Sequence, residues 1–409
     1  EKDGYRNDSL SMNYGYNINE NFRVENYLYY NDSLVEYDSV AKASNDIEAS
    51  DDQHTSYTGR LINTIGNFKN TISYNNTYIL RNVTGNAKKN YYGYRDAINF
   101  ISEYNFDLDN RIIFGLDNEF DKAELYNYYT ASSYTESDEA IYSQYFDLQL
   151  RPREDTYTTF GLRRDYHTTA EDYYTGRATV AYKLDNNTKL RANLGTSVRF
   201  PSLNSLNHGN SLVVKENLKA ETGKSIDIGI DKFLPENNIN LSATTFFLEY
   251  KNDIKGWASH SGGVGGTYAL ANSLSKTESY GLELQTNWKP NDNYALGLGY
   301  TRTESYDGTT CDNPNSSAAN DGSSCNDEMN VRVPRNQLNL IGTKIFNKNL
   351  SQTLKFKYVD ERRDYGNTNN GFTDVILSNY VVADLVTNYK LFDTYNLNIS
   401  AKNILDARY

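Results

Sequence analysis

The sequence predicts an all-β protein, specifically a transmembrane antiparallel up-and-down β-barrel, and three observations support this. Polar and apolar residues alternate along the whole chain, which is typical of strands with one apolar and one polar face. Short and long connections between these segments alternate from one end to the other. The chain also holds 37 Tyr, 16 Phe and 2 Trp, although only 38% of its 409 residues are hydrophobic.

The composition excludes several other classes of protein. There are 41 Lys and Arg against 53 Asp and Glu, a net charge of −12, so bulk charge gives no support to nucleic-acid binding. Disordered chains are poor in aromatic residues, and this chain is rich in them. No run approaches the roughly 18 consecutive apolar residues of a membrane-spanning helix. The sequence therefore predicts a protein without a nucleic-acid partner that crosses a membrane with strands.

Period-two alternation defines the strands. Ile226, Ile228 and Ile230 alternate with Asp227 and its polar neighbours, so one face of this strand is apolar and the other is polar. Four further segments with the same division are residues 146–151, 190–199, 282–288 and 395–402.

The connections set the order of the strands. Nine are short and rich in turn-forming residues: Asn17 to Asn21, Ile65 to Asn67, Asp107 to Asn110, Arg153 to Asp155, Asp185 to Asn187, Leu234 to Asn238, Lys289 to Asn293, Asn347 to Asn349, and Phe392 to Thr394. Eight are longer and polar: Asp32 to Gln53, Asn82 to Asn90, Tyr126 to Asp138, His167 to Asp172, Phe200 to Lys224, Lys255 to Leu274, Ser305 to Pro334, and Arg362 to Ser378. They join eighteen strands of about ten residues, with all tight turns at one end.

This asymmetry favours a membrane barrel over a soluble sandwich. Barrels of this kind have short turns on one side, long loops on the other and a polar interior. A sandwich needs an apolar interior, whereas the second face here carries Arg, Asn, Asp and Lys. The many Tyr residues fit aromatic girdles at the two membrane interfaces, with cross-strand packing in a soluble sheet as the alternative.

Several segments resemble the TonB-dependent outer-membrane receptors. Residues 195–206 (GTSVRFPSLNSL) and 217–225 (NLKAETGKS) resemble a signature of the family's barrel, with Ala220 where the family usually has Pro. Residues 247–254 (FLEYKNDI), 280–284 (YGLEL) and 403–409 (NILDARY) are similar to later barrel motifs. Within the family, the barrel length and the segment Asp3 to Asp32 are most similar to the cobalamin receptor subgroup.

The resemblance implies a barrel of 22 strands in the outer membrane of a Gram-negative bacterium. The eighteen strands then leave three missing before Ser9 and one after Tyr409, and the plug domain with its energy-coupling box is absent. Residues 1–409 are therefore expected to be one β-barrel domain, incomplete at both ends, of a protein that acts as a monomer.

The resemblance also implies a function. We expect import of a scarce bulky nutrient, with cobalamin favoured over a ferric siderophore, by loop capture and plug gating driven by the TonB energy-coupling complex. A passive outer-membrane porin is the alternative. No enzyme activity is expected, because the histidines His54, His167, His208 and His260 are dispersed and no nucleophile motif is present.

The candidate ligand-binding residues are mostly aromatic side chains of the long connections, which offer apolar rings with polar tips to a large amphipathic ligand. Packing of loop on loop is the alternative role for them. The candidates are Tyr126, Tyr128, Tyr129, Tyr134, Trp257, His260, Tyr268, Tyr306 and Tyr365, together with Arg199, which is expected to face the interior with Arg191.

Two further sites are predicted. Asp38, Asp46, Asp51 and Asp52 in the acidic connection 32–53 could hold calcium, although no EF-hand pattern is present and such loops are usually just solvated. No other cofactor is expected. Cys311 and Cys325 are expected to form a disulfide that closes a surface loop, with two free thiols as the alternative.

Overall fold

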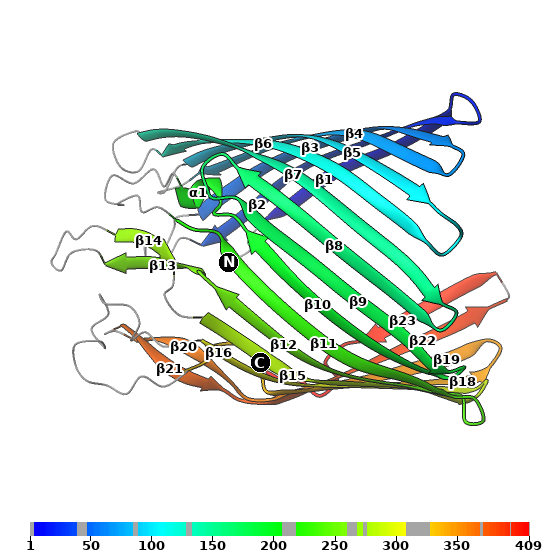
Figure 1. The fold of residues 1–409 in the computed structure, drawn as a ribbon. Helices are drawn as coiled ribbons and strands as arrows, with labels where there is room; N and C mark the ends of the chain where they lie inside the picture. Colours follow the sequence, from blue (N-terminus) through cyan, green and yellow to red (C-terminus); the bar gives the residue numbers. More distant parts are fainter. Residues whose placement is uncertain are drawn as a thin grey trace.

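The computed structural model describes residues 4–38, 47–84, 89–127, 133–206, 218–259, 268–272, 276–307, 328–368, 371–392 and 394–408. The strands form one curved wall around a hollow, with the tight turns at one end and the loops at the other (Figure 1). Within these residues, no helix has the length and apolar character needed to span a bilayer.

Over the described residues, the wall is a single sheet of nineteen strands. They are β1 (Tyr5–Asn17), β2 (Phe22–Asp38), β3 (Ile47–Ile65), β4 (Phe68–Thr84), β5 (Lys89–Asn105), β6 (Arg111–Asn127), β7 (Ser133–Arg153), β8 (Thr156–His167), β9 (Tyr173–Asp185), β10 (Thr188–Arg199), β11 (Glu221–Leu234), β12 (Ile239–Lys251), β15 (Lys276–Asn291), β16 (Tyr294–Asp307), β17 (Glu328–Met329), β18 (Asn336–Asn347), β19 (Leu350–Val359), β22 (Tyr380–Leu391) and β23 (Tyr395–Ala401).

Apart from the two-residue β17, each strand of the wall pairs antiparallel with the next one along the chain. The eighteen long strands confirm the predicted number and the meander. Two small hairpins, β13 (Ile254–Ser259) with β14 (Tyr268–Asn272) and β20 (Arg362–Thr368) with β21 (Gly371–Leu377), stand in loops, and α1 (Leu203–Leu206) lies at the loop end (Figure 1).

All nine predicted turns lie where the wall reverses at its short-turn end. Local side chains explain them, since Asn and Asp carry a carbonyl oxygen that accepts backbone N–H groups two or three residues later. Asn19 Oδ1 accepts the N–H groups of Asn21 and Phe22, and Asn347 Oδ1 accepts those of Asn349 and Leu350.

The strands near the N-terminus are longer than predicted. Strands β2 to β7 have 17 to 21 residues, so much of the segments 32–53, 82–90 and 126–138, predicted as loops, is strand. The prediction was wrong there for a physical reason. Above the apolar belt both faces of a hairpin meet polar surroundings, so the alternation disappears while the backbone ladder continues.

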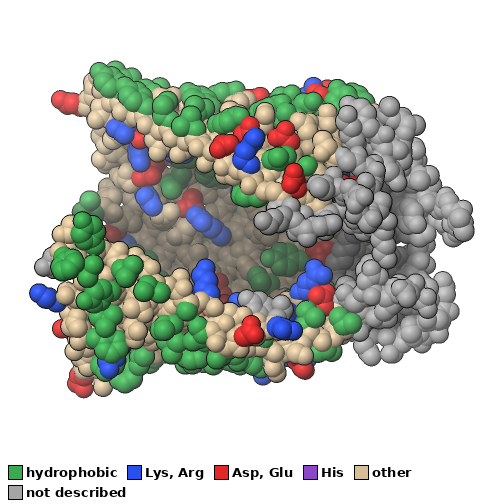
Figure 2. All heavy atoms as spheres, turned by 180° about the vertical axis from the view of Figure 1, so that it is seen from behind, with side chains coloured by type: hydrophobic (Ala, Val, Ile, Leu, Met, Phe, Trp, Pro, Cys, Tyr) green, Lys and Arg blue, Asp and Glu red, His purple; other side chains and the backbone are tan. Residues whose placement is uncertain are grey.

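The two faces of the wall have opposite character. On β8, Phe160 and Leu162 point outward and are 50% and 69% exposed, whereas the inward Asp165 is 4% exposed. Figure 2 shows hydrophobic side chains over the outer surface, and Lys, Arg, Asp and Glu within the hollow. This arrangement confirms the predicted division into an apolar outer face and a polar interior.

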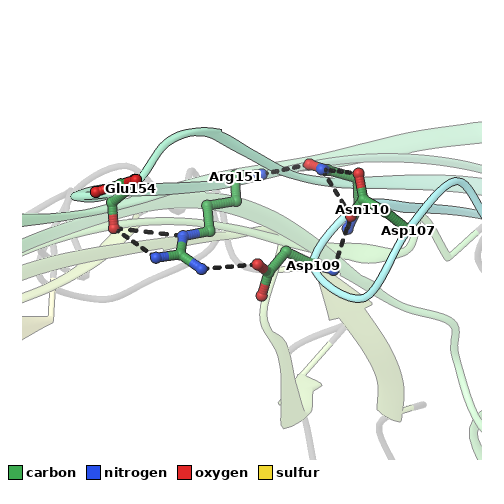
Figure 3. A network of polar contacts seen from close by, with 5 residues as sticks. All are labelled: Asp107, Asp109, Asn110, Arg151 and Glu154. Carbon is green, nitrogen blue, oxygen red and sulfur yellow. Dashed lines mark hydrogen bonds and ion pairs between the residues drawn. The ribbon is translucent and has the colours of Figure 1, made fainter.

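The short-turn end is held together across neighbouring turns (Figure 3). Arg151 Nη1 lies 2.7 Å from Asp109 Oδ2, and its Nη2 donates to the carbonyl oxygen of Glu154 at 2.9 Å. The Arg151 backbone N–H donates to Asn110 Oδ1, and the Asn110 amide in turn donates to the Asp107 carboxylate. The turn after β5 is thereby fixed to the end of β7.

A charged side chain on the outward face should destabilise the wall. Ile228 lies near the middle of β11 and is 53% exposed, so Ile228→Arg should lower the unfolding free energy in micelles by about 2–4 kcal/mol. Asn193→Arg is the matched control, because it faces the interior opposite Asp227 on the neighbouring strand. Urea unfolding of both variants tests this, and equal losses of stability would contradict the assignment of the two faces.

The Asp107 turn should respond to acid. Hydrogen bonds from the Asn110 side chain and from the Asp109 backbone N–H hold the pKa of Asp107 below its ordinary value. Its contribution to stability is therefore complete above the unfolded pKa of about 3.9 and is lost as the pH falls through the lower folded pKa.

We expect the urea midpoint of Asp107→Ala to lie below that of the wild type at pH 7, with the difference shrinking in acid. Asp107→Asn keeps an acceptor oxygen without titrating and serves as the control. A difference between wild type and Asp107→Ala that grows toward low pH would be the opposite of this expectation.

Candidate ligand site in the interior

The interior wall carries a compact charged cluster where β6, β7 and β8 lie side by side. Asp117 lies opposite Ser143 in the register, and Ser143 lies opposite Asp165, so the three side chains share one face. Arg163 joins them, with Nη1 2.8 Å from Asp117 Oδ2 and Nε 2.8 Å from Asp165 Oδ1. Ser143 Oγ donates to Asp165 Oδ1 at 2.6 Å. Every carboxylate of the cluster is thus hydrogen-bonded, as buried charges require.

Two cavities open beside this cluster. One of about 450 Å³ is lined by the cluster together with Asn99, Glu119, Ile141, Thr175, Ser197, Val198 and Phe200. The other, of about 570 Å³, includes Tyr145 and the ion pair of Arg177 with Asp147, whose nearest atoms are 2.6 Å apart. Fixed polar side chains of this kind can orient a ligand, which is the part that the few polar groups play in ligand sites.

The segment after β10, which we call the inner strap (residues 200–206), borders the first cavity. The Phe200 ring lies 4.5 Å from the His167 ring and 5.7 Å from the Tyr173 ring, measured between centroids. Pro201 is fully buried, and α1 at the end of the strap approaches β6 and β7. The strap therefore turns back over the interior face of β6 to β9.

Below the strap lies a buried pair. His167 Nε2 is 3.2 Å from Glu139 Oε2, and the His167 side chain is fully buried. His167 Nδ1 accepts the backbone N–H of Thr169 at 3.2 Å. These contacts fix the ring on which Phe200 rests.

The predicted residue Arg199 lies on the interior face, as expected. Its Nη1 is 3.1 Å from Glu221 Oε2, and its side chain is 80% exposed. Arg191 also faces the interior, where its Nη2 donates to Ser242 and Thr244. Arg199 therefore remains available to a ligand, while Arg191 is held by the wall.

Three predicted aromatic residues face outward. The rings of Tyr126 and Tyr134 lie against each other across β6 and β7, tilted by 40° with centroids 4.6 Å apart, on the same strand face as the exposed Phe120. Tyr306 shares the outward face of β16 with Leu298, and its hydroxyl donates to Glu304 at 3.1 Å. Their part in ligand binding stays a prediction, but it would have to occur from outside the wall.

The remaining aromatic and cysteine predictions cannot be placed in the site. Tyr128, Tyr129, His260, Cys311 and Cys325 lie outside the described residues. The backbones of Trp257, Tyr268 and Tyr365 belong to β13, β14 and β20, while their side chains lie outside the description.

The predicted calcium ligands are separated by the strand geometry. Asp51 and Asp52 are neighbours on β3 and point to opposite faces, and Asp52 is held by Arg81 in two contacts of 2.8 and 3.1 Å. These two carboxylates do not fit one shared ion. Asp46 and the Asp38 side chain lie outside the described residues, which contain no group of three candidate metal ligands.

The sequence reasoning missed the interior cluster. Its residues lie on predicted strands, whereas the predicted ligand-binding residues came mainly from the long connections. They are Asp117, Ser143, Arg163 and Asp165. A signal existed, because each is a polar residue at an alternate position whose apolar neighbours face the lipid. Their assembly into one cluster needs the register, which the period alone does not give.

Comparisons with known proteins agree with this fold. A family model described as "TonB dependent receptor-like, beta-barrel" matches residues 1–404. The chain is similar to the ferripyoverdine receptor of Pseudomonas aeruginosa bound to ferripyoverdine, at 12% identity and a TM-score of 0.76, over 99% of this chain and 62% of that one. No curated protein matches the chain.

Two further solved structures are similar. One is a mutant of the ferric enterobactin receptor PfeA from Pseudomonas aeruginosa in complex with enterobactin, at 17% identity and a TM-score of 0.74, over 100% of this chain and 66% of that one. The other is the outer-membrane transporter YddB from Escherichia coli, at 11% identity and a TM-score of 0.80, over 98% and 65%. At these identities the likeness concerns the fold, and the chain spans less than two thirds of each of the three proteins.

The strap should shield His167 from the solvent. Phe200→Ala removes the ring that covers the imidazole, so we expect His167 to become reactive toward diethyl pyrocarbonate, while in the wild type it stays unmodified. Mass spectrometry of the peptide that contains His167 measures this. Phe160→Ala, on the outer face of β8, is the control and should leave the reactivity low; equal reactivity of Phe200→Ala and wild type would show that the strap does not cover the ring.

Proposed function

The chain belongs to the TonB-dependent receptor β-barrel family, and on that premise we propose that the protein imports a scarce, bulky nutrient across the outer membrane. The family and the outer-membrane neighbours place this barrel in the outer membrane of a Gram-negative bacterium. Energy would come from the TonB complex acting through a plug domain.

The observation that carries the proposal is the polar site on the interior face of the wall, where the two cavities lie. The cluster of Asp117, Arg163 and Asp165 and the exposed Arg199 offer fixed charges and hydrogen-bond groups around the two cavities. A ligand captured by the loops would meet these groups on its way inward. A plug rearrangement would then release it toward the periplasm.

Two ligand classes remain in this proposal, and different observations favour them. The similar structures named above were described with ferripyoverdine and with enterobactin, which favours a siderophore. The resemblance of the segment Asp3 to Asp32 to cobalamin receptors favours a corrinoid. We favour the siderophore over the corrinoid, because the likeness to the named structures extends over nearly the whole chain.

The alternatives from the sequence lose support. Family membership favours a gated receptor over a passive porin. The family and the solved neighbours are receptors and transporters rather than enzymes, which fits the expectation that the protein performs no covalent chemistry.

Equilibrium binding to the full-length receptor in micelles tests the ligand. We expect a ferric siderophore to bind with submicromolar Kd and Arg199→Ala to weaken binding by about tenfold, the loss of one charged hydrogen bond. Lys344→Ala, on the outer face near the short turns, is the control and should bind as the wild type does.

Titration of the same receptor with a corrinoid, with and without Ca²⁺, tests the second ligand class. Calcium-sensitive corrinoid binding without siderophore binding would reverse the order of the two classes and support the calcium prediction. High ion conductance of the full-length protein, with no saturable binding of either ligand, would favour the porin.

A further inference from the structure

The outer face of four neighbouring wall strands carries a group of cations at the loop end. Lys251 ends β12, Lys276 begins β15, Arg302 lies near the end of β16, and Arg335 directly precedes β18. The register places the first three on the outward face, together with the exposed Phe247, Leu282 and Leu298. We call these four residues the outer cation patch.

The charges in this patch are layered. Glu249 contacts Lys251 at 3.2 Å and Lys276 at 3.4 Å, and Glu304 contacts Arg302 at 2.7 Å and Arg335 at 3.2 Å. Lys276 also contacts Glu278, whose side chain is 31% exposed. The three carboxylates are thus 12 to 31% exposed, whereas the four cations are 47 to 55% exposed. The carboxylates therefore lie against the wall and orient the cations, which form the outermost layer.

The cations keep hydrogen-bonding capacity. An ammonium group has three N–H donors and a guanidinium five, more than the one or two carboxylate contacts that each cation makes with described residues. Such groups suit an anion with several acceptor oxygens, and phosphate matches Arg and Lys donors well.

Apolar surface continues directly below the patch. Tyr280 and Tyr306 stack between the two pairs of cations with ring centroids 6.3 Å apart, and Leu282, Leu284 and Leu296 follow toward the short turns. A cationic rim above an apolar belt is complementary to an amphiphile that has an anionic head and apolar tails. The loop end of such a barrel is its extracellular end, so this surface meets the outer leaflet.

We propose that the outer cation patch binds an anionic lipid, one whose headgroup phosphate is not neutralised by a cation of its own, with its acyl chains on the belt of Leu and Phe side chains. This proposal rests on the outer-membrane location and holds whichever nutrient is imported. The headgroup phosphate would accept hydrogen bonds from Lys251 and Lys276 on one side and from Arg302 and Arg335 on the other.

The opposite part of the wall provides an internal contrast. On β6 and β7, Lys122 also points outward, but it contacts both Glu124 and Glu136, and the Glu136 side chain is 46% exposed against 42% for Lys122. There the carboxylates share the outermost layer, so a phosphate would meet like charge. Lys122 is therefore the matched control for the patch.

Native mass spectrometry of the full-length receptor in micelles tests the proposal, with dioctanoyl phosphatidic acid as probe and dioctanoyl phosphatidylcholine as comparator. We expect K251Q/K276Q/R302Q/R335Q to weaken phosphatidic acid binding by at least about tenfold, because the loss of each cation near a charged lipid surface lowers the affinity roughly fivefold. K122Q should bind within about twofold of the wild type. Phosphatidylcholine should bind weakly to all three.

Folding of each variant is checked by its heat-modifiable mobility on gels, and K251Q/K276Q replaces the quadruple variant if that one does not fold. Equal binding by patch variant and wild type would overturn the proposal, as would an equal loss in K122Q. Displacement of the lipid by millimolar inorganic phosphate would show an anion site without lipid selectivity and would also overturn it.

Discussion

The backbone ladder is the constraint on which the rest of the structure depends. In a lipid environment every N–H and C=O of the wall must find a partner within the sheet, and the long strands from β2 to β22 each pair with both of their neighbours in the chain. The side chains are then free to suit two different surroundings. Ile228 can face lipid while Asp227, one residue away, faces the interior.

The same ladder builds both charged surfaces of the molecule. Register brings Asp117, Ser143 and Asp165 together on the inside, where Arg163 satisfies both carboxylates. On the outside, register brings Lys251 next to Lys276 at the loop end. Inside, the carboxylates are held by Arg163 and Ser143; outside, Glu249 and Glu304 lie beneath more exposed cations.

The inner strap shows how a segment after a wall strand can shape the interior. Phe200 rests on the buried His167 ring, and the chain then crosses the face of β6 and β7 instead of rising away from the wall. One of the two cavities owes part of its lining to this turn. Because Glu139 and Thr169 fix the imidazole, the position of the strap depends on a few buried contacts.

The sequence by itself determined the strand number, the nine turns and the two faces of the wall, because these depend on near neighbours. Asn19 and Asn347 form turns with residues two or three positions away, and the period of two assigns Arg191 and Arg199 to the interior. Only the tertiary structure decided where Tyr126 and Tyr134 point and which polar residues meet Arg163. Above the apolar belt the alternation that marks strand ends is lost, and partners that lie 46 residues apart, such as Arg163 and Asp117, are brought together by register, which no local pattern specifies.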